Sequence, residues 1–183
     1  MIFCEQCGTQ LNKNAGFCSK CGSKTVENNN ITKFIDGFPN FSVEGISFSY
    51  PSNYKVSYEK SAEGDFESLV ITCGKKNEEE PDMIIITCGK NDPRSPENYI
   101  DDYKTAVKGQ MVRYKFGPVY NSTFIGINCI AIDYKQSYMF QNAGNGVLYS
   151  FTRNGNLYGI TKHSDIKENL FSEFQVLEQS LVI

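Results

Sequence analysis

From residue 41 onward, apolar and polar residues alternate with a period of two. Ile46-Ser47-Phe48-Ser49-Tyr50 alternates without interruption, Pro51-Ser52-Asn53 turns the chain, and Tyr54-Lys55-Val56-Ser57-Tyr58-Glu59 alternates again. Successive side chains of a β-strand point to opposite faces of its sheet. The pattern therefore predicts two strands of an antiparallel sheet that has one buried face and one face in water.

Similar patterns predict six further strands. They span Phe66–Cys73, Met83–Gly89, about 112–120, 123–136, Val147–Thr152 and Leu157–Lys162. Arg153-Asn154-Gly155-Asn156 separates the last two strands, and Asn-Gly favours a type I′ turn, so we expect a hairpin there. The charged segment Lys75–Asp82 lies between two of the strands and is expected to be a solvated loop.

Two segments have the periodicity of amphipathic helices. Ser95-Pro96-Glu97 is typical of a helix start, with an N-capping serine, proline at the first helical position and an acid in the first turn. Its apolar face is formed by Ile100, Tyr103, Val107 and Met111, and Gly109 marks its expected end. A closing helix begins at Asp165, which has capping-box spacing to Glu168. Its apolar face is formed by Ile166, Leu170, Phe174, Leu177 and Leu181.

This order of strands, helix, strands and helix predicts an α+β fold, in which an antiparallel β-sheet packs in layers with two main helices. The helices would cover one sheet face each or share one face. We assign the α+β domain to residues 41–183, a small separate module to residues 1–25, and a linker to residues 26–40, which include three consecutive asparagines. In an alternative interpretation, Phe34, Ile35 and Phe38 dock on the α+β domain.

Residues 1–25 contain two copies of a six-residue motif, Phe-Cys-x-x-Cys-Gly. The two copies are Phe3-Cys4-Glu5-Gln6-Cys7-Gly8 and Phe17-Cys18-Ser19-Lys20-Cys21-Gly22. Two cysteines three positions apart can hold one edge of a coordination tetrahedron, and the glycine that follows suits a turn with positive φ. Two such pairs on a short hairpin would complete a four-thiolate shell of the kind that binds one structural Zn²⁺.

Other chemistries fit this spacing less well. A thioredoxin-type redox pair belongs to a βαβ unit, which this segment lacks. Disulfides need an oxidising compartment, and a chain that reaches a cysteine at position 4 leaves no room for a secretory leader. A catalytic zinc needs an open coordination position, whereas four cysteines close the shell. Iron remains an alternative to zinc.

The segment from about residue 2 to residue 24 resembles the short bacterial and archaeal zinc-ribbon module that precedes many otherwise unrelated proteins. The resemblance implies that Cys4, Cys7, Cys18 and Cys21 are the ligands of one structural zinc ion. It is specific for the metal and does not identify a partner.

The other three cysteines lie within predicted strands. Cys73 and Cys88 occupy the same place in two copies of Ile-Thr-Cys-Gly-Lys, and Cys129 lies in an apolar stretch. A second metal or redox site would need more ligands close to them in the sequence. We expect all three to be small buried hydrophobic residues.

The segment Ile46-Ser47-Phe48-Ser49-Tyr50-Pro51, the tyrosine at position 54, the order of elements and the closing hairpin and helix together resemble the PsbP-like fold. This resemblance covers residues 41–183. It implies a role in binding or assembly, and it assigns no functional residue.

Composition and charge narrow the function classes. The chain is 40% hydrophobic and 21% charged, as expected for a globular protein, and its net charge of −3 provides no overall basic field to attract nucleic acid. No apolar run approaches the roughly 18 residues that a membrane-spanning helix needs. We therefore expect a cytoplasmic protein.

These observations favour a non-enzymatic, zinc-binding adaptor whose partner is another protein. One alternative is a nucleic-acid-binding protein, with the ribbon using Lys13, Lys20 and Lys24; another is an α+β domain that binds a small ligand or has enzymatic activity.

No catalytic residue is assigned. The single histidine, His163, precedes Ser164 and Asp165, and sequence neighbours do not readily assemble a triad. We expect His163 to be exposed or to cap the closing helix, and the loop Lys90–Arg94 to be the first place to look for ligand contacts.

Overall fold

The chain divides into two compact units, residues 1–31 and residues 32–183. The computed structural model describes residues 2–3, 10–11, 20–21, 34–63, 66–76, 82–108, 112–139, 141–164 and 174–183. In the smaller unit, β1 (Ile2–Phe3) pairs antiparallel with β2 (Gln10–Leu11). Lys20 and Cys21 form an exposed turn in the same unit.

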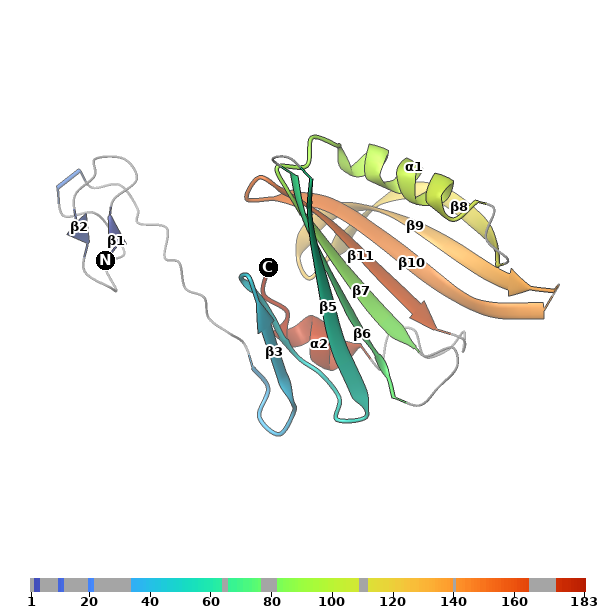
Figure 1. Cartoon of the computed structure of the whole chain (residues 1–183), viewed down its shortest axis with the longest axis horizontal. Coiled ribbons are helices and arrows are strands. Elements are labelled where there is room, and N and C mark those ends of the chain that lie inside the picture. Colours follow the sequence, from blue (N-terminus) through green and yellow to red (C-terminus); the bar gives the residue numbers. More distant parts are fainter. Residues whose placement is uncertain are drawn as a thin grey trace. The chain divides into compact units, whose positions relative to one another are not determined.

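The larger unit is built on one seven-stranded sheet (Figure 1). Its strands are β5 (Tyr54–Glu63), β6 (Phe66–Lys75), β7 (Met83–Lys90), β8 (Arg113–Phe124), β9 (Ile127–Tyr138), β10 (Gln141–Arg153) and β11 (Asn156–Ser164). Their order across the sheet is β5-β6-β7-β11-β10-β9-β8, and every neighbouring pair is antiparallel. The predicted antiparallel sheet is confirmed for these strands, but the predicted strand at Ile46–Tyr50 is not part of it and pairs instead in a separate two-stranded sheet.

Two tight turns join neighbouring strands of the sheet, and the sequence predicted one of them correctly. Asn154 and Gly155 join β10 to β11 with φ values of 52° and 78°, so the predicted type I′ hairpin is confirmed. The predicted break near residues 121–122 is wrong, because β8 continues to Phe124 and pairs with β9 throughout that region. The chain reverses instead at Ile125 and Gly126, which have φ values of 47° and 81°.

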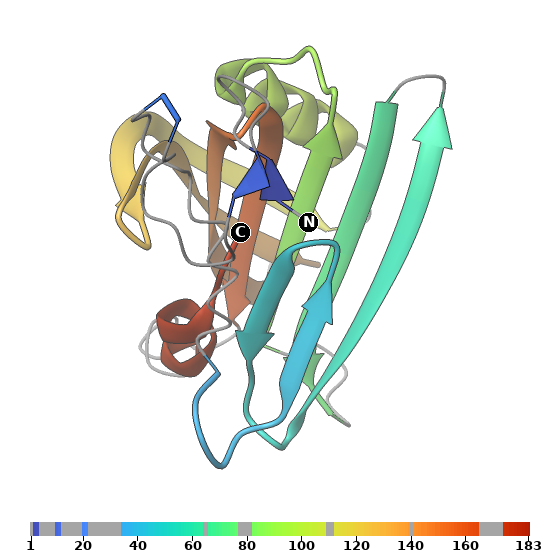
Figure 2. The same ribbon diagram turned by 90° about the vertical axis from the view of Figure 1, so that its left-hand side faces the viewer.

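The two faces of the sheet are covered by different elements. On one face lies α1 (Pro96–Ala106), whose Ile100 packs with Ile132 and Leu148. On the other face lie the hairpin of β3 (Asn40–Val43) and β4 (Ile46–Ser49) and the short helix α2 (Gln175–Ser180). Figures 1 and 2 show this division, so each face has its own helix.

Helix α1 begins as its sequence predicts. Ser95 is the N-cap, and its hydroxyl accepts a hydrogen bond from the backbone N–H of Asn98. Val107 caps the other end, and the predicted end at Gly109 lies outside the described residues. With 11 residues, α1 is too short to cross a membrane, and no helix in the described ranges is long and apolar enough to do so.

The predicted closing helix is described only from Phe174 onward. Its expected start at Asp165 and Glu168 lies outside the described residues. Phe174 and Leu177 are buried against the sheet, as the apolar stripe predicts. Leu181 is also buried, but its backbone is already extended, and Val182 pairs with Ser47 of β4.

Strand β4 departs from the predicted arrangement. All four of its residues are buried, including Ser47 and Ser49, so the expectation of one face in water is wrong for this strand. The reason is the last turn of the chain, which covers the serine side. There the Ser180 hydroxyl accepts a hydrogen bond from the Ser49 backbone N–H at 2.8 Å.

Residues 35–40 of the predicted linker are bound to the larger unit. The Ile35 backbone N–H donates to the Ser49 hydroxyl at 2.8 Å, and that hydroxyl donates to the Asn40 side chain at 2.7 Å. The Tyr50 backbone N–H donates to the Pro39 carbonyl. These contacts support docking at Ile35, whereas the side chains of Phe34 and Phe38 are exposed, so the docked interpretation holds only in part.

Candidate functional site

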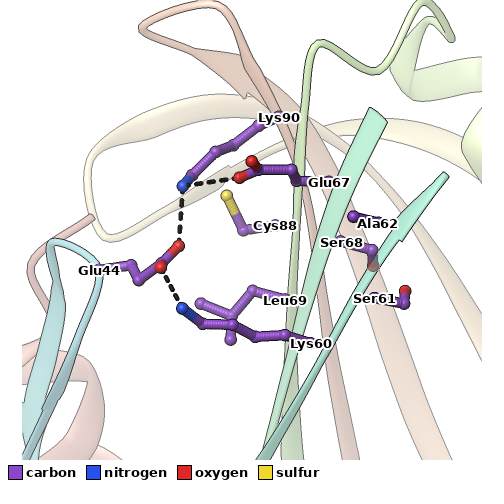
Figure 3. Close-up of a pocket in the computed structure, with 9 residues that line it drawn as sticks. All are labelled: Glu44, Lys60, Ser61, Ala62, Glu67, Ser68, Leu69, Cys88 and Lys90. Atoms are coloured by element: carbon purple, nitrogen blue, oxygen red, sulfur yellow. Dashed lines mark hydrogen bonds and ion pairs between the residues drawn. The ribbon is translucent and has the colours of Figure 1, made fainter. Parts of the chain in front are cut away.

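A pocket of about 310 Å³ lies between the β3–β4 turn and the sheet, over strands β5, β6 and β7 (Figure 3). Its lining comprises Glu44, Lys60, Ser61, Ala62, Glu67, Ser68, Leu69, Cys88 and Lys90. The volume falls at the lower end of the range of about 300–1,000 Å³ that is common for small-ligand pockets. We define this group of residues as the hairpin pocket.

The pairing register of β5, β6 and β7 brings together the residues that form the floor of the hairpin pocket. Lys60 of β5 lies opposite Leu69 of β6, which in turn lies opposite Cys88 of β7. Two positions further along the strands, Ala62, Glu67 and Lys90 form a second row. Because the side-chain period of a strand is two, both rows face the same side of the sheet. This side is the one that carries the β3–β4 hairpin.

Glu44 reaches this floor from the turn above it. Glu44 and Gly45 join β3 to β4 with φ values of 48° and 85°, as in a two-residue hairpin turn. The Glu44 carboxylate lies between two lysines. One oxygen accepts from Lys60 Nζ, and the other accepts from Lys90 Nζ at 2.7 Å (Figure 3). Lys90 also donates to Glu67 at 3.1 Å, which extends the network.

The network shifts the proton affinities of its members. Hydrogen bonds from Lys60 and then Lys90 lower the pKa of Glu44 from 4.5 to about 2. Hydrogen bonds to Glu44 and Glu67 raise the pKa of Lys90 above its usual value. Both shifts favour the charged forms of Glu44 and Lys90 in the physiological pH range.

The cysteine of the hairpin pocket is not chemically activated. Cys88 is buried, and burial raises the pKa of its thiol. Cys73 is also buried, and desolvation raises the pKa of its thiol to about 12. A raised pKa keeps a cysteine in its unreactive thiol form. Together with Cys129, which is buried as well, these residues occupy the core as predicted.

Sequence reasoning missed Glu44, Lys60 and Glu67 as site residues. A detectable pattern was present, because charged residues continue the core-facing registers of the strands. The β5 face runs through Tyr54, Val56 and Tyr58 to Lys60, and the β7 face runs through Ile84, Ile86 and Cys88 to Lys90. A charged residue that follows a row of apolar residues on the same strand face indicates the edge of the hydrophobic core, where a pocket can open.

The loop Lys90–Arg94, singled out from the sequence, has two different parts. Lys90 lines the hairpin pocket. Asp92 and Arg94 instead hold the loop itself together, since the Asp92 carboxylate accepts from the Arg94 guanidinium at 2.6 Å and from the Arg94 backbone N–H at 3.0 Å. This ion pair lowers the pKa of Asp92. Of this loop, Lys90 alone lines the hairpin pocket.

His163 is buried, so the expectation that it is exposed is wrong, and the helix start that it was expected to cap lies outside the described residues. Strand β11 continues to Ser164, and the His163 ring is buried and stacked on Tyr134 at a centroid distance of 6.1 Å. Gly144 provides the space, because a Cβ atom there would lie 2.5 Å from the imidazole. Ser164 is next to it on the same strand and so faces the opposite side of the sheet. His163 is therefore a packed core residue.

The predicted metal centre lies in the smaller unit. Cys21 occupies an exposed turn, whereas Cys4, Cys7 and Cys18 lie outside the described residues. The described part of the chain contains no group of three or more metal-binding side chains. The fit to zinc therefore depends on the donor set, and four thiolates in two Cys-x-x-Cys pairs suit tetrahedral Zn²⁺.

Comparisons with known proteins address both units. The family model described as a zinc-ribbon domain matches residues 3–25. The solution structure of cyanobacterial PsbP (CyanoP) from Synechocystis sp. PCC 6803 is similar, with a TM-score of 0.55 and 12% sequence identity over 80% of this chain and 92% of that chain. No curated protein matches the sequence. The chain therefore carries a zinc-ribbon domain at residues 3–25 and an α+β unit with a PsbP-like fold.

Proposed function

We propose that this protein is a non-enzymatic, zinc-binding adaptor in which both the ribbon and the α+β unit bind protein partners. The observation that carries the proposal is the zinc-ribbon match at residues 3–25, which includes all four cysteines of the repeated motif. One structural Zn²⁺ would be held by Cys4, Cys7, Cys18 and Cys21. Such a closed shell holds a small surface rigid without supplying an open position for catalysis.

The remaining sequence features agree with a protein partner. The net charge is −3, and the lysines of the ribbon, Lys13, Lys20 and Lys24, are opposed by Glu5 and by the formal charge of −2 on a zinc–tetrathiolate centre. A balance near zero gives little attraction for a phosphate backbone. Thiolate ligands also persist best in a reducing compartment, which supports a cytoplasmic location.

The direct test is a nuclease-treated pull-down that compares the native protein with a Cys18→Ser/Cys21→Ser variant. The adaptor proposal predicts a defined protein partner that the variant loses. Cys73→Ser is the matched control, since it removes a buried thiol outside the ribbon and should retain the partner. Recovery of the same partner by both cysteine variants would contradict a role for the ribbon.

Zinc removal tests the metal itself. We expect a chelator to release one zinc ion per chain and to unfold the ribbon, because structural zinc sites supply the folding free energy of such small modules. Zinc release is measured with a colorimetric indicator, and the two units are followed separately by NMR. The α+β unit should keep its thermal midpoint. Loss of both units together would show that they fold as one.

A further inference from the structure

The ion pairs of Glu44 in the hairpin pocket are not needed to hold the β3–β4 hairpin on the sheet. The β3–β4 hairpin is already attached to the sheet by the burial of Ile46 and Phe48, and to the C-terminal segment by the pairing of Ser47 with Val182. The Glu44 ion pairs add little to this attachment, because the side chains of Lys60 and Lys90 are 48% and 37% exposed. A carboxylate nevertheless sits between two ammonium groups beside an open volume of about 310 Å³.

We propose that the hairpin pocket is a binding site for a small organic monocarboxylate, and that the Glu44 side chain occupies the position of its carboxylate in the ligand-free protein. The ligand's two oxygens would accept from Lys60 Nζ and Lys90 Nζ, as the two oxygens of Glu44 do. Its apolar part would lie over Leu69 and Cys88. This site is independent of the zinc ribbon and adds a ligand to the proposed adaptor.

The geometry selects a carboxylate. Each Glu44 oxygen pairs with a different lysine, so the space between the two ammonium groups already accommodates one planar bridging carboxylate (Figure 3). The lysines are fixed on β5 and β7 with β6 between them, and this spacing is set by the backbone ladder of the sheet. A preorganised pair of cations avoids most of the entropic cost of ordering the site on binding.

The charge balance selects a single negative charge. When Glu44 turns away, Lys60, Lys90 and Glu67 remain, and two positive charges with one negative charge leave a net charge of +1. One carboxylate neutralises this charge. The floor beneath it contains Leu69 and Cys88, so an alkyl or aryl group of the ligand leaves water when it lies over them.

Glu44 can leave without disturbing the fold. Its side chain is 30% exposed and lies at the tip of a two-residue turn, where the neighbouring Gly45 has no packing contact at its Cβ position. Rotation of the Glu44 side chain is therefore sufficient to release the lysines. Because Glu44 is tethered beside them, it competes with the ligand at a high effective concentration. Its removal should therefore strengthen binding.

The test is isothermal titration of the full-length, zinc-loaded protein with sodium butyrate and sodium hexanoate at low ionic strength. We expect Glu44→Gln to bind these probes at least about tenfold more tightly than the native protein, because the tethered competitor is gone. Hexanoate should bind more tightly than butyrate. Butanamide, which has the same length without the charge, should not bind.

Two further variants separate a specific site from a general charge effect. Glu67→Gln also removes one negative charge from the hairpin pocket but leaves Glu44 in place, so it should improve binding less than about threefold. Lys60→Met in the Glu44→Gln background should abolish binding, and circular dichroism checks that this variant is folded. The proposal is wrong if Glu44→Gln binds no better than the native protein, if Glu67→Gln gains as much, or if Lys60→Met retains binding.

Discussion

Two lysines on the same face of the sheet pair with glutamates in opposite circumstances. Lys162 of β11 is 2% exposed, donates to Glu178 of α2 and lies over the rings of Phe124 and Tyr149 at 5.8 Å and 5.4 Å. Lys60 of β5 is half exposed and donates to Glu44 at the rim of the hairpin pocket. Both are lysine–glutamate ion pairs, but the lysine of the first is buried and that of the second is exposed to water.

This difference indicates different roles. Removal of one member of a buried ion pair leaves the other without its counter-charge, which is costly, whereas water and salt replace an exposed partner. The Lys162–Glu178 pair therefore fastens α2 to the sheet. The lysines that flank Glu44 can exchange one carboxylate for another at little cost to the fold, which is the property that a binding site needs.

The largest effect is expected for Lys162→Ala. The substitution leaves Glu178 without this lysine and removes the side chain that lies over Phe124 and Tyr149. We expect a loss of about 3 kcal/mol in the free energy of unfolding, measured by urea denaturation. Lys60→Ala is the control on the same sheet face. Equal losses for the two variants would contradict the contrast between them.

Lys162→Met separates charge from packing at the buried site. Methionine keeps most of the length of the lysine side chain and can pack against the same two rings, so the charged contacts are lost and most of the packing is kept. Glu178 then lacks this counter-charge, but its side chain is 24% exposed and water can solvate it, so we expect a loss of about 2 kcal/mol, smaller than that of Lys162→Ala. A loss as large as that of the alanine variant would show that charge, rather than packing, dominates at this position.

Acid should loosen the exposed site in a defined pH range. The folded-state pKa of Glu44 is lowered from 4.5 to about 2, so its stabilising contribution is fully present above pH 4.5 and is lost as the pH falls through about 2. Carboxyl-carbon NMR should show a pKa for Glu44 that lies well below 4.5. In Lys60→Met, which removes the largest cause of the shift, the Glu44 pKa should rise toward 4.5. An unchanged pKa would contradict the assigned contact.

The smallest effect is expected on the stability of Glu44→Gln and Lys60→Met. Both side chains are partly solvated, and the turn and strand that carry them are held by other contacts. Their thermal midpoints at pH 7 should fall by much less than that of Lys162→Ala, because solvated ion pairs contribute little. A large destabilisation would show that the network holds the hairpin in place and would weaken the contrast with Lys162.

Local patterns predicted those parts of the fold that depend on neighbours in the chain. Asn154-Gly155 gave the correct hairpin because both residues accept positive φ, and Ser95-Pro96 gave the correct helix start because its cap is formed within three residues. The period-two pattern also identified the antiparallel sheet. The four cysteines of the ribbon predicted zinc from their spacing alone, and the family match covers the same segment.

Predictions failed where a distant segment decides the environment. Ser47 and Ser49 are buried because residues 180–182 fold over them, although their own strand reads as half exposed. His163 is buried because Gly144 and Tyr134, on other strands, make room for its ring and stack on it. The local sequence pattern does not reveal these contacts, because each of them joins residues that are far apart in the chain.

The sequence by itself therefore determined the type of element at most places, the Asn154-Gly155 turn and the metal-binding motif, because these follow from backbone preferences and ligand spacing over a few residues. Only the tertiary structure decided that Glu44, Lys60 and Lys90 share one pocket. These residues lie on a turn and two strands that meet through sheet pairing and hairpin packing. The position of each charge along its strand was visible in the sequence, but its neighbours across the sheet were fixed by register and by the element packed on top.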